Sequence, residues 1–335
     1  MSNVISIGVV DVPGRVWVAP MTGISDLPFR RITAALGAAY VATEMVAGEA
    51  LLQSRPEAVR RAAVGEGLPL AVIQLVGADP KAIAQAAEHA ARAGADIIDL
   101  NLGCPAKTVT GVACGSALMR DPRQAESLIA AAVDASNRPV TVKMRLGWDS
   151  NSINAVELAI RAQSVGAAGL TVHGRTREQF YSGAADWSAV RAVKAAVSIP
   201  VLVNGDVVDW VTATRALTQS GADGVMIGRG AMGRPWLAAT IEAGLRGAAS
   251  PEPGAAARLR IVREHLAGSV AFYGMHRGVR MFRKHLAAYI DHAPWPSDAT
   301  VRRAARADLC RLESEGDIAA ALTELWGQAG GRLAA

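Results

Sequence analysis

A cysteine in a Gly-Cys-Pro loop is the first candidate for chemistry in this sequence. Cys104 lies in DLNLGCPAK, directly after an apolar run that predicts a β-strand. A thiol that follows a strand end can exchange a proton with a substrate, whereas most free cysteines are buried and inert. Cys114 and Cys310 lack such a setting, and we interpret both as structural. Cys104 is therefore the predicted catalytic residue, with an inert thiol as the alternative.

Three polar residues interrupt other apolar runs. Lys143 lies within PVTVKMRLGW, and burial of its ammonium group costs free energy unless an anion lies nearby. The anionic ring or phosphate of a cofactor would meet this need, and a salt bridge or a side chain that extends to the surface is the alternative. Gln74 in VIQLVG and His173 in TVHGRTR either satisfy a hydrogen bond in the core or face a planar heteroaromatic ring.

The segment IGRGAMGRPW predicts a phosphate site. Its glycines, Gly228, Gly230 and Gly233, let backbone N–H groups approach an anion at the start of a helix. The spacing also matches G-x-G-x-x-G, but a Pro/Gly-rich stretch follows instead of a second strand that ends in an acid, so we do not predict a Rossmann unit. A tight turn that requires glycine is the alternative.

Short apolar runs alternate with alanine-rich helical stretches through the first 245 residues or so, a pattern typical of a parallel sheet covered by helices. Eight such runs in about 250 residues favour an α/β fold of the (β/α)8 TIM barrel class over residues 1–247, rather than a doubly wound sheet. The predicted strands are 16–21, 40–44, 70–75, 96–101, 140–145, 169–173, 201–204 and 224–227.

Helix boundaries support this interpretation. Asp79-Pro80 and Asp121-Pro122 predict helix N-caps with proline in the first turn, and Asp209 predicts a third cap. Gly94, Gly166 and Gly221 are expected just after helix ends.

The carboxyl ends of the strands meet at one face of a barrel, and active sites lie there. Polar residues end seven of the eight predicted strands, which packing alone does not explain. The set expected at this mouth is Pro20, Met21, Thr22, Gln74, Asn101, Cys104, Lys143, Arg145, His173, Asn204, Gly205, Asp206, Gly228, Arg229 and Gly230.

A second, helical domain is predicted over residues 258–335, after the linker AASPEPGAAA at 248–257. Ten Lys or Arg against three acidic residues lie between Arg258 and Arg306. Arg277, Arg280, Arg283 and Lys284 recur at three- to four-residue spacing, so they share one helix face, which either contacts RNA or is simply solvated.

Composition limits the class of protein. With 335 residues, 51% hydrophobic and 19% charged, the chain can form a large core, and three cysteines exclude a disulfide framework. We found neither a basic leader nor eighteen consecutive apolar residues, so we expect a cytoplasmic protein without membrane contact. No His/Asp/Glu cluster is predicted at the strand ends, and we expect no metal. One barrel with one helical domain predicts a monomer.

The motifs together resemble the flavin-dependent tRNA-dihydrouridine synthases of bacteria over nearly the whole chain. Cys114, before GSALM, departs from the family pattern, which usually has a small residue there. The segments that carry the resemblance are APMTGISDLPFR (19–30), DLNLGCPAKTV (99–109), GSALM (115–119), PVTVKMRLGW (139–148), TVHGRTREQFYSGAADW (171–187), PVLVNGD (200–206), GVMIGRGAMGRPW (224–236) and GVRMFRKHLAAYI (278–290).

The resemblance implies a barrel that holds FMN, with NADPH as the electron donor. It also implies that the protein reduces the C5–C6 double bond of specific tRNA uridines, with Cys104 as the proton donor. It implies a helical domain that grips tRNA. The implied cofactor residues are Pro20, Met21, Thr22, Gln74, Lys143, His173, Asn204, Gly205, Asp206, Gly228 and Arg229. The residues expected at the substrate are Asn101, Arg145, Arg175, Arg177, Arg280, Arg283 and Lys284. The sequence does not indicate which uridine is reduced, and it contains no evident binding motif for NADPH.

Three other functions fit parts of this pattern. An FMN-dependent oxidoreductase of free pyrimidines, of the dihydroorotate dehydrogenase type, shares the barrel and the active-site cysteine, but the basic tail argues against it. A tRNA-binding protein with a vestigial flavin pocket is disfavoured by Cys104, Lys143 and His173 together. A metal-dependent aldolase-type barrel lacks the required ligand cluster.

Overall fold

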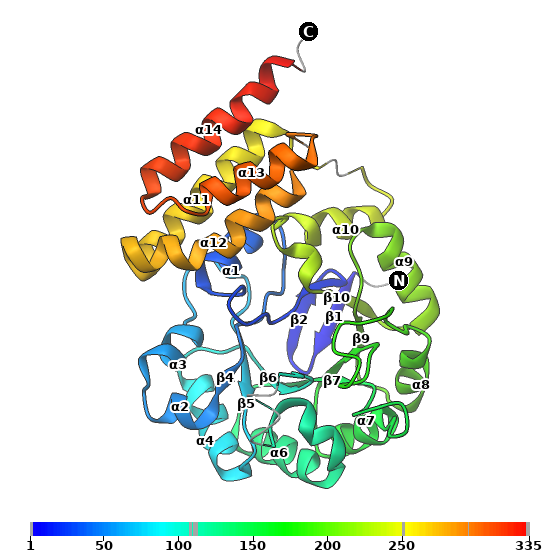
Figure 1. Ribbon diagram of the computed structural model, residues 1–335. Coiled ribbons are helices and arrows are strands. Elements are labelled where there is room, and N and C mark those ends of the chain that lie inside the picture. The colour runs from blue at the N-terminus through cyan, green and yellow to red at the C-terminus, as the bar shows by residue number, and fades with distance from the viewer. Residues whose placement is uncertain (1–2, 107–108, 110–112, 250–251, 294, 333–335) are drawn as a thin grey trace.

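Parallel strands separated by helices close into a barrel, as the alternating pattern predicts. The computed structural model describes residues 3–106, 109, 113–249, 252–293 and 295–332. Its eight-stranded sheet has the order β3-β10-β9-β8-β7-β6-β5-β4, and Val18–Val41 and Ala42–Val72 bridges close the ring (Figure 1). The strands are β3 (Val16–Val18), β4 (Val46–Ala47), β5 (Val72–Val76), β6 (Ile97–Leu102), β7 (Val140–Arg145), β8 (Gly169–His173), β9 (Val201–Asn204) and β10 (Gly224–Ile227).

The second predicted strand, 40–44, is wrong in its bounds. Only Val41 and Ala42 make bridges there, and β4 follows at Val46–Ala47. The ladder breaks because the backbone N–H of Gln74 donates to the hydroxyl of Thr43 (2.9 Å) instead of to a strand carbonyl. The first predicted strand is also shorter than expected: β3 ends at Val18, Ala19 still donates its N–H to the Ile227 carbonyl (2.8 Å), and Pro20 and Met21 lie at the rim of the barrel.

Helices surround the sheet, and their predicted caps are confirmed. The carboxylate of Asp79 accepts N–H groups of Lys81 and Ala82, that of Asp121 accepts Gln124, and Asp209 forms a capping box with Thr212. The barrel helices are α1 (Leu27–Ala35), α2 (Gly48–Leu52), α3 (Pro56–Arg61), α4 (Pro80–Arg92), α6 (Pro122–Ala135), α7 (Ala155–Ser164), α8 (Ala189–Ala196), α9 (Trp210–Ser220) and α10 (Leu237–Leu245), with short 3₁₀ turns η1 (Gly115–Arg120) and η2 (Arg229–Ala231).

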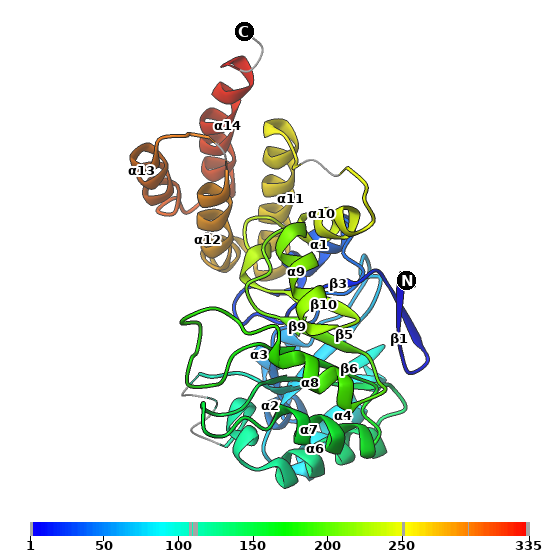
Figure 2. The same cartoon turned by 90° about the vertical axis from the view of Figure 1, so that its right-hand side faces the viewer.

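A hairpin that we did not predict closes the amino end of the barrel. It consists of the antiparallel strands β1 (Val4–Ile7) and β2 (Val10–Pro13). Ile5 and Ile7 reach Gly224 and Gly169 at the start of two barrel strands, where an added Cβ would lie 2.9 and 2.7 Å from their Cδ1 atoms. In Figure 2 the blue β1 lies on one side of the barrel and the long green loops lie on the other. The barrel is therefore accessible from its carboxyl end.

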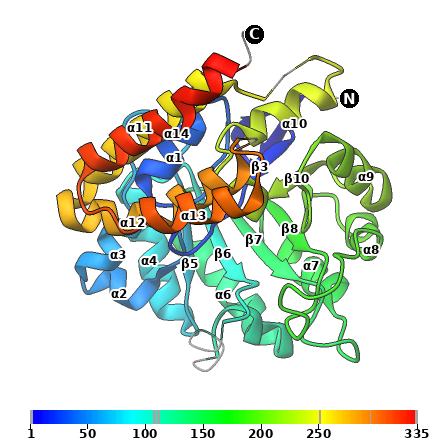
Figure 3. The ribbon, with the colours of Figure 1, turned by 45° about the horizontal axis from the view of Figure 1, so that its top comes forward.

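In the described part of the chain, the C-terminal segment forms four helices, of which the first two pack against the barrel and the last two pack on those. Their shared core includes Ile32 of α1 and Trp236 just before α10, and Figure 3 shows the four helices on the side of the barrel where α1 and α10 lie. The first of them begins three residues before the predicted start at 258, because Gly254 is the N-cap and alanines fill the first turn. The helices are α11 (Ala255–Tyr273), α12 (Met275–His292), α13 (Ala299–Leu309) and α14 (Glu315–Arg332). In the described part of the chain, no helix combines the length and apolar character needed to cross a bilayer.

Gly233 has a role at this junction that differs from the expected phosphate cradle. Its φ is +70°, and an added Cβ would lie 2.3 Å from the carbonyl carbon of Ala288 in α12. The third glycine of the G-x-G-x-x-G match therefore allows the close approach of α12 to the barrel.

Gly233→Ala should lower the free energy of unfolding by more than the strain of placing alanine in a left-handed backbone conformation. A left-handed alanine costs about 1–2 kcal/mol, and overpacking adds a further ~1–3 kcal/mol. Gly247→Ala is the matched control, because Gly247 has φ +71° but nothing within 4 Å of an added Cβ. Urea unfolding of both variants measures the difference, and equal losses would show that the close approach has no energetic cost.

Candidate functional site

A cavity of about 730 Å³ opens at the carboxyl ends of the strands. The structure places all eleven residues predicted for the cofactor on its wall, from the rim after β3 to the loop after β10, together with Asn101, Cys104, Arg145 and Gly230. The predicted convergence of strand ends at one mouth is therefore observed. Residues 107 and 108 of the 99–109 motif lie outside the described residues. The roles of the wall residues stay predictions.

A hydrogen-bonded chain links the barrel interior to the candidate catalytic loop. Gln74 donates to Asp99 (2.6 Å) and accepts from the amide of Asn101 (2.8 Å). The side-chain oxygen of Asn101 in turn accepts the backbone N–H of Cys104 (2.9 Å), and Ser116 donates to the Cys104 carbonyl (2.8 Å). The backbone of the Gly-Cys-Pro loop is thus held by Asn101 at the end of β6 and by Ser116 of η1, which fixes the position of Cys104.

Asp99 is an interior group that we did not single out. It is 2% exposed, accepts from Thr141 as well as Gln74, and burial raises its pKa to about 6. Asp99 and Asn101 are two residues apart in β6, so their side chains point to the same face of the strand, toward the barrel interior. The desolvation argument applied to Lys143 would have found Asp99 too, because it is also a charged residue within an apolar strand.

Lys143 has an amide partner and, among the residues that the structure describes, no direct ion pair. Its Nζ donates to the Asn204 side-chain oxygen (3.1 Å), and Asn204 donates onward to the Met226 carbonyl (2.7 Å). The pKa of Lys143 is lowered to about 8, chiefly by burial and also by the charge of Arg145, while Asp99 and Cys104 oppose this shift. The ammonium group therefore lines the cavity with its positive charge only partly balanced, as an anion-binding group would.

Arg175 organises the opposite wall. It donates to Asp206 and to the carbonyls of Ser182 (3.1 Å) and Gly183 (2.6 Å), and lies 3.3 Å from His173 Nε2. Burial, reinforced by the neighbouring cations, holds the pKa of His173 well below its usual range, so its imidazole is neutral. Asp206 adopts φ +55°, and its pKa is lowered because Arg175 donates to it, although burial opposes this.

The residues expected at tRNA fall into two separate groups. Arg145 and Arg175 are both 2% exposed, and Arg145 donates to the carbonyls of Gly103, Thr176 and Phe180. These two guanidinium groups hold the rim loops and do not face solvent. We had expected them to contact phosphates of tRNA. Arg177 lies over Trp148 (4.5 Å), whereas Arg280, Arg283 and Lys284 lie on α12 and do not line the cavity.

Residues on the rim that sequence reasoning missed include an exposed tyrosine. Tyr181 is 52% exposed, and the guanidinium carbons of Arg145 and Arg229 lie 5.7 and 4.6 Å from the centroid of its ring. Arg234 and His292 also line the cavity, the latter from the end of α12. Tyr181 falls within the quoted 171–187 motif, but no local pattern indicates that His292 would reach the barrel mouth.

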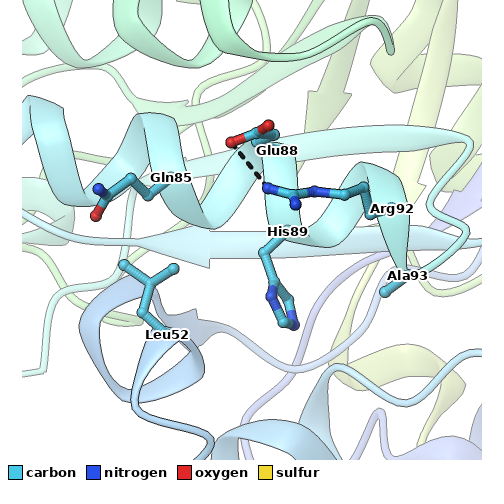
Figure 4. A pocket seen from close by; sticks show the side chains of 6 residues that line it. All are labelled: Leu52, Gln85, Glu88, His89, Arg92 and Ala93. Carbon is cyan, nitrogen blue, oxygen red and sulfur yellow. Dashed lines mark ion pairs between the residues drawn. The ribbon is translucent and has the colours of Figure 1, made fainter.

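Another hollow lies on the outer surface between α2 and α4 (Figure 4). Leu52 and the exposed side of α4 line it, and Glu88 and Arg92 form an ion pair across one turn (2.9 Å). It shares no residue with the strand-end cavity, where the polar groups converge. We therefore place the candidate site at the strand ends.

Residues 17–322 match the family model for dihydrouridine synthase (Dus). The chain belongs to this family. A probable tRNA-dihydrouridine synthase of Rhodobacter capsulatus is 51% identical over 292 residues, which cover 86% of this chain and 90% of that protein. The tRNA-dihydrouridine synthase B of Pseudomonas aeruginosa is 42% identical over 297 residues, which cover 87% of this chain and 88% of that protein.

Solved structures with low identity share the fold of this Dus family member. An amine oxidase for 6-hydroxypseudooxynicotine from Pseudomonas geniculata has a TM-score of 0.58 at 15% identity, over 79% of this chain and 52% of that one. Morphinone reductase in complex with tetrahydroNAD has a TM-score of 0.51 at 16% identity, over 76% and 93%. Both comparisons support the TIM-barrel architecture.

Lys143→Met should remove a pH dependence of stability in the ligand-free protein. Burial lowers the pKa of Lys143 from its ordinary value of 10.5 to about 8 in the folded state, so the unfolded chain binds more protons between these values. The free energy of unfolding should therefore rise with pH in this window for the wild type, and rise less for K143M. Urea titrations across the window measure the difference, with the exposed Lys81→Met as control. Parallel profiles for wild type and K143M would contradict the burial of a titrating ammonium.

Proposed function

We propose that this chain is a tRNA-dihydrouridine synthase that uses FMN and NADPH to reduce the C5–C6 double bond of specific uridines in tRNA. The observation that carries the proposal is the position of Cys104 on the rim of a cavity whose wall holds Lys143, His173, Asn204 and the Gly228 loop. Family membership and the names of the relatives add support.

The cavity fits FMN in size and in chemistry. Its volume lies within the range of about 300–1,000 Å³ found for cofactor sites. In the proposal, Pro20, Met21 and Thr22 border the ring system, while Gln74, Lys143 and His173 contact the ring or the ribityl chain. Asn204, Gly205, Asp206, Gly228 and Arg229 hold the remainder and the phosphate. When bound, FMN would supply the hydride chemistry.

Cys104 provides the proton in this mechanism. Addition of hydride to C6 of uracil places negative charge toward O4, and a proton must then reach C5. The Cys104 thiol lies on a loop whose backbone is fixed by Asn101 and Ser116, so the proton can be delivered from a defined position. Asn101 and Lys143 are the nearby donors that would stabilise charge on the pyrimidine.

A uridine stacked in folded tRNA does not reach this depth, so the base must be flipped into the cavity. We propose that the α12 residues Arg280, Arg283 and Lys284 bind the tRNA backbone. Arg280 and Lys284 are exposed, whereas Arg277 is already paired with Glu57 (2.6 Å). Lys284 extends to Gly23 beside the cavity rim, where an added Cβ would lie 2.6 Å from its Nζ. Arg145 and Arg175 act in the proposal by holding the rim loops, and Arg177 completes the basic surround.

The experiment that tests this function is anaerobic. Purified protein is reduced with NADPH, and the flavin absorbance is followed after addition of tRNA that lacks dihydrouridine, with free uridine and orotate as controls. Reoxidation by tRNA alone is expected. Reoxidation by a free pyrimidine but not by tRNA would favour the dihydroorotate dehydrogenase type of reaction, and a protein without flavin would overturn the cofactor assignment.

Cys104→Ala should keep the flavin and lose turnover by about 10²–10⁴-fold, because the substitution removes the general acid and leaves the residues proposed to hold the cofactor unchanged. The readout is the rate of tRNA-dependent reoxidation. Cys310→Ala is the control, since that thiol lies in the C-terminal helices and contacts the Arg283 carbonyl (3.8 Å). Normal turnover by C104A would refute the role of Cys104 as proton donor.

Arg280→Ala should weaken tRNA binding and leave the reduction of bound flavin by NADPH unchanged. Loss of one phosphate contact should also lower the slope of log affinity against log salt concentration by about 1. Arg303→Ala removes the same charge from an exposed position on α13 and serves as control. Equal tRNA affinity and salt slope in both variants would remove Arg280 from the tRNA interface.

A further inference from the structure

Three buried side chains with lone pairs meet where the barrel joins the C-terminal helices. Asp26 is the N-cap of α1, His265 lies in α11 and His285 lies in α12. They are 3%, 1% and 1% exposed. One carboxylate oxygen of Asp26 and one ring nitrogen of each histidine lie within 4.8 Å of one another. None of the three lines the strand-end cavity, so the proposed tRNA chemistry does not use them.

The histidines are incompletely satisfied. Nε2 of His265 and Nε2 of His285 are buried and have no hydrogen-bond partner among the described residues. Such a buried nitrogen costs free energy unless something binds it. Nδ1 of His265 lies 3.1 Å from the Tyr289 hydroxyl, and metal-bound histidines commonly use their second nitrogen in such a contact. If Nδ1 carries the proton toward Tyr289, the lone pair of His265 lies on Nε2.

The protonation states of the two imidazoles suit a metal ion. Burial lowers the pKa of His285 to about 3 and that of His265 well below its usual range, so both imidazoles are neutral, the form that binds metals. The pKa of Asp26 is raised to about 6, chiefly by burial and also by Glu44, against the opposing effects of its hydrogen bonds with Phe29 and Tyr273 and of the charge of Arg30. A divalent ion would stabilise the ionised carboxylate.

The rings are held in place by aromatic packing. Phe29 of α1 stacks on His285 with centroids 5.4 Å apart, and Phe282 meets His265 edge-on at 5.1 Å. The two imidazole centroids lie 4.5 Å apart. This packing limits how far either ring can turn, and all three side chains are buried, so the cluster is a fixed set of interior groups rather than a chance approach of surface groups.

We propose that Asp26, His265 and His285 bind one divalent transition-metal ion of the zinc type, which joins α1 of the barrel to α11 and α12. Two imidazoles and a carboxylate are a common zinc donor set, with water as the fourth ligand. Ligand atoms around a tetrahedral zinc are about 3.3 Å apart, so binding would draw the three groups slightly together. The ion would be structural and would differ from our expectation of no metal.

Metal binding to the purified full-length protein tests this proposal. After chelation and desalting, the protein is titrated with Zn²⁺ and Co²⁺, and bound metal is measured by mass spectrometry. We expect one equivalent bound, a rise in Tm with Zn²⁺, and Co²⁺ absorption bands typical of a tetrahedral site at wavelengths longer than the flavin bands.

The variants identify the ligands. Asp26→Asn keeps an oxygen for the Phe29 cap, and it should lose more than about 100-fold in affinity, as should His285→Gln. Tyr289→Phe removes only the outer contact and should lose about 10-fold. His89→Gln, which changes an exposed histidine on α4, is the control and should bind as the wild type does. Flavin content and circular dichroism report whether each variant is folded.

Two results would overturn the proposal. Wild-type protein that binds no Zn²⁺ or Co²⁺ above the background of the D26N variant excludes the site, and this arm does not depend on any variant with altered histidines. Full binding by both D26N and His285→Gln would assign the metal to other groups such as the free thiols. Neither result bears on tRNA reduction, which the flavin reoxidation experiment tests separately.

Discussion

The burial of charged groups inside the barrel is the constraint on which the candidate site depends. Lys143 and Asp99 lie within strands whose other side chains are largely aliphatic, and an ammonium or carboxylate group is stable there only with polar partners. For Asp99 the partners come from the two adjacent strands, Gln74 of β5 and Thr141 of β7, and for Lys143 the partner is Asn204 of β9, two strands away. The polar layer thus spans several strands, and its geometry is fixed by the register of the sheet.

This layer also determines how the rim is built. Gln74 positions Asn101, and Asn101 holds the backbone of the Cys104 loop. On the other side, buried Arg175 ties the loop after β8 to Asp206. Loops at a barrel mouth carry function only when the scaffold orients them. Arg145 and Arg175, which we first expected to bind phosphates, instead hold much of the rim in position.

The C-terminal helices depend on a second set of close contacts. Gly233 allows α12 to approach the barrel, and Ile32 and Trp236 join the apolar core of the helices. Asp26, His265 and His285 lie in the same junction. The junction fixes where the basic residues of α12 lie relative to the cavity, and His292 at the end of that helix lines the cavity itself.

The sequence alone determined the barrel, because apolar strand periodicity, Asp-Pro caps and helix-ending glycines are local signals. It also identified Cys104 and the polar strand ends, since parallel strands must bring their carboxyl ends to one face. It did not reveal the β1–β2 hairpin, the break at Thr43, or the burial of Arg145 and Arg175. Each of these depends on contacts between residues far apart in the chain. The same holds for Asp26, His265 and His285, which no spacing in the sequence connects and which only the packing of α1 against α11 and α12 brings together.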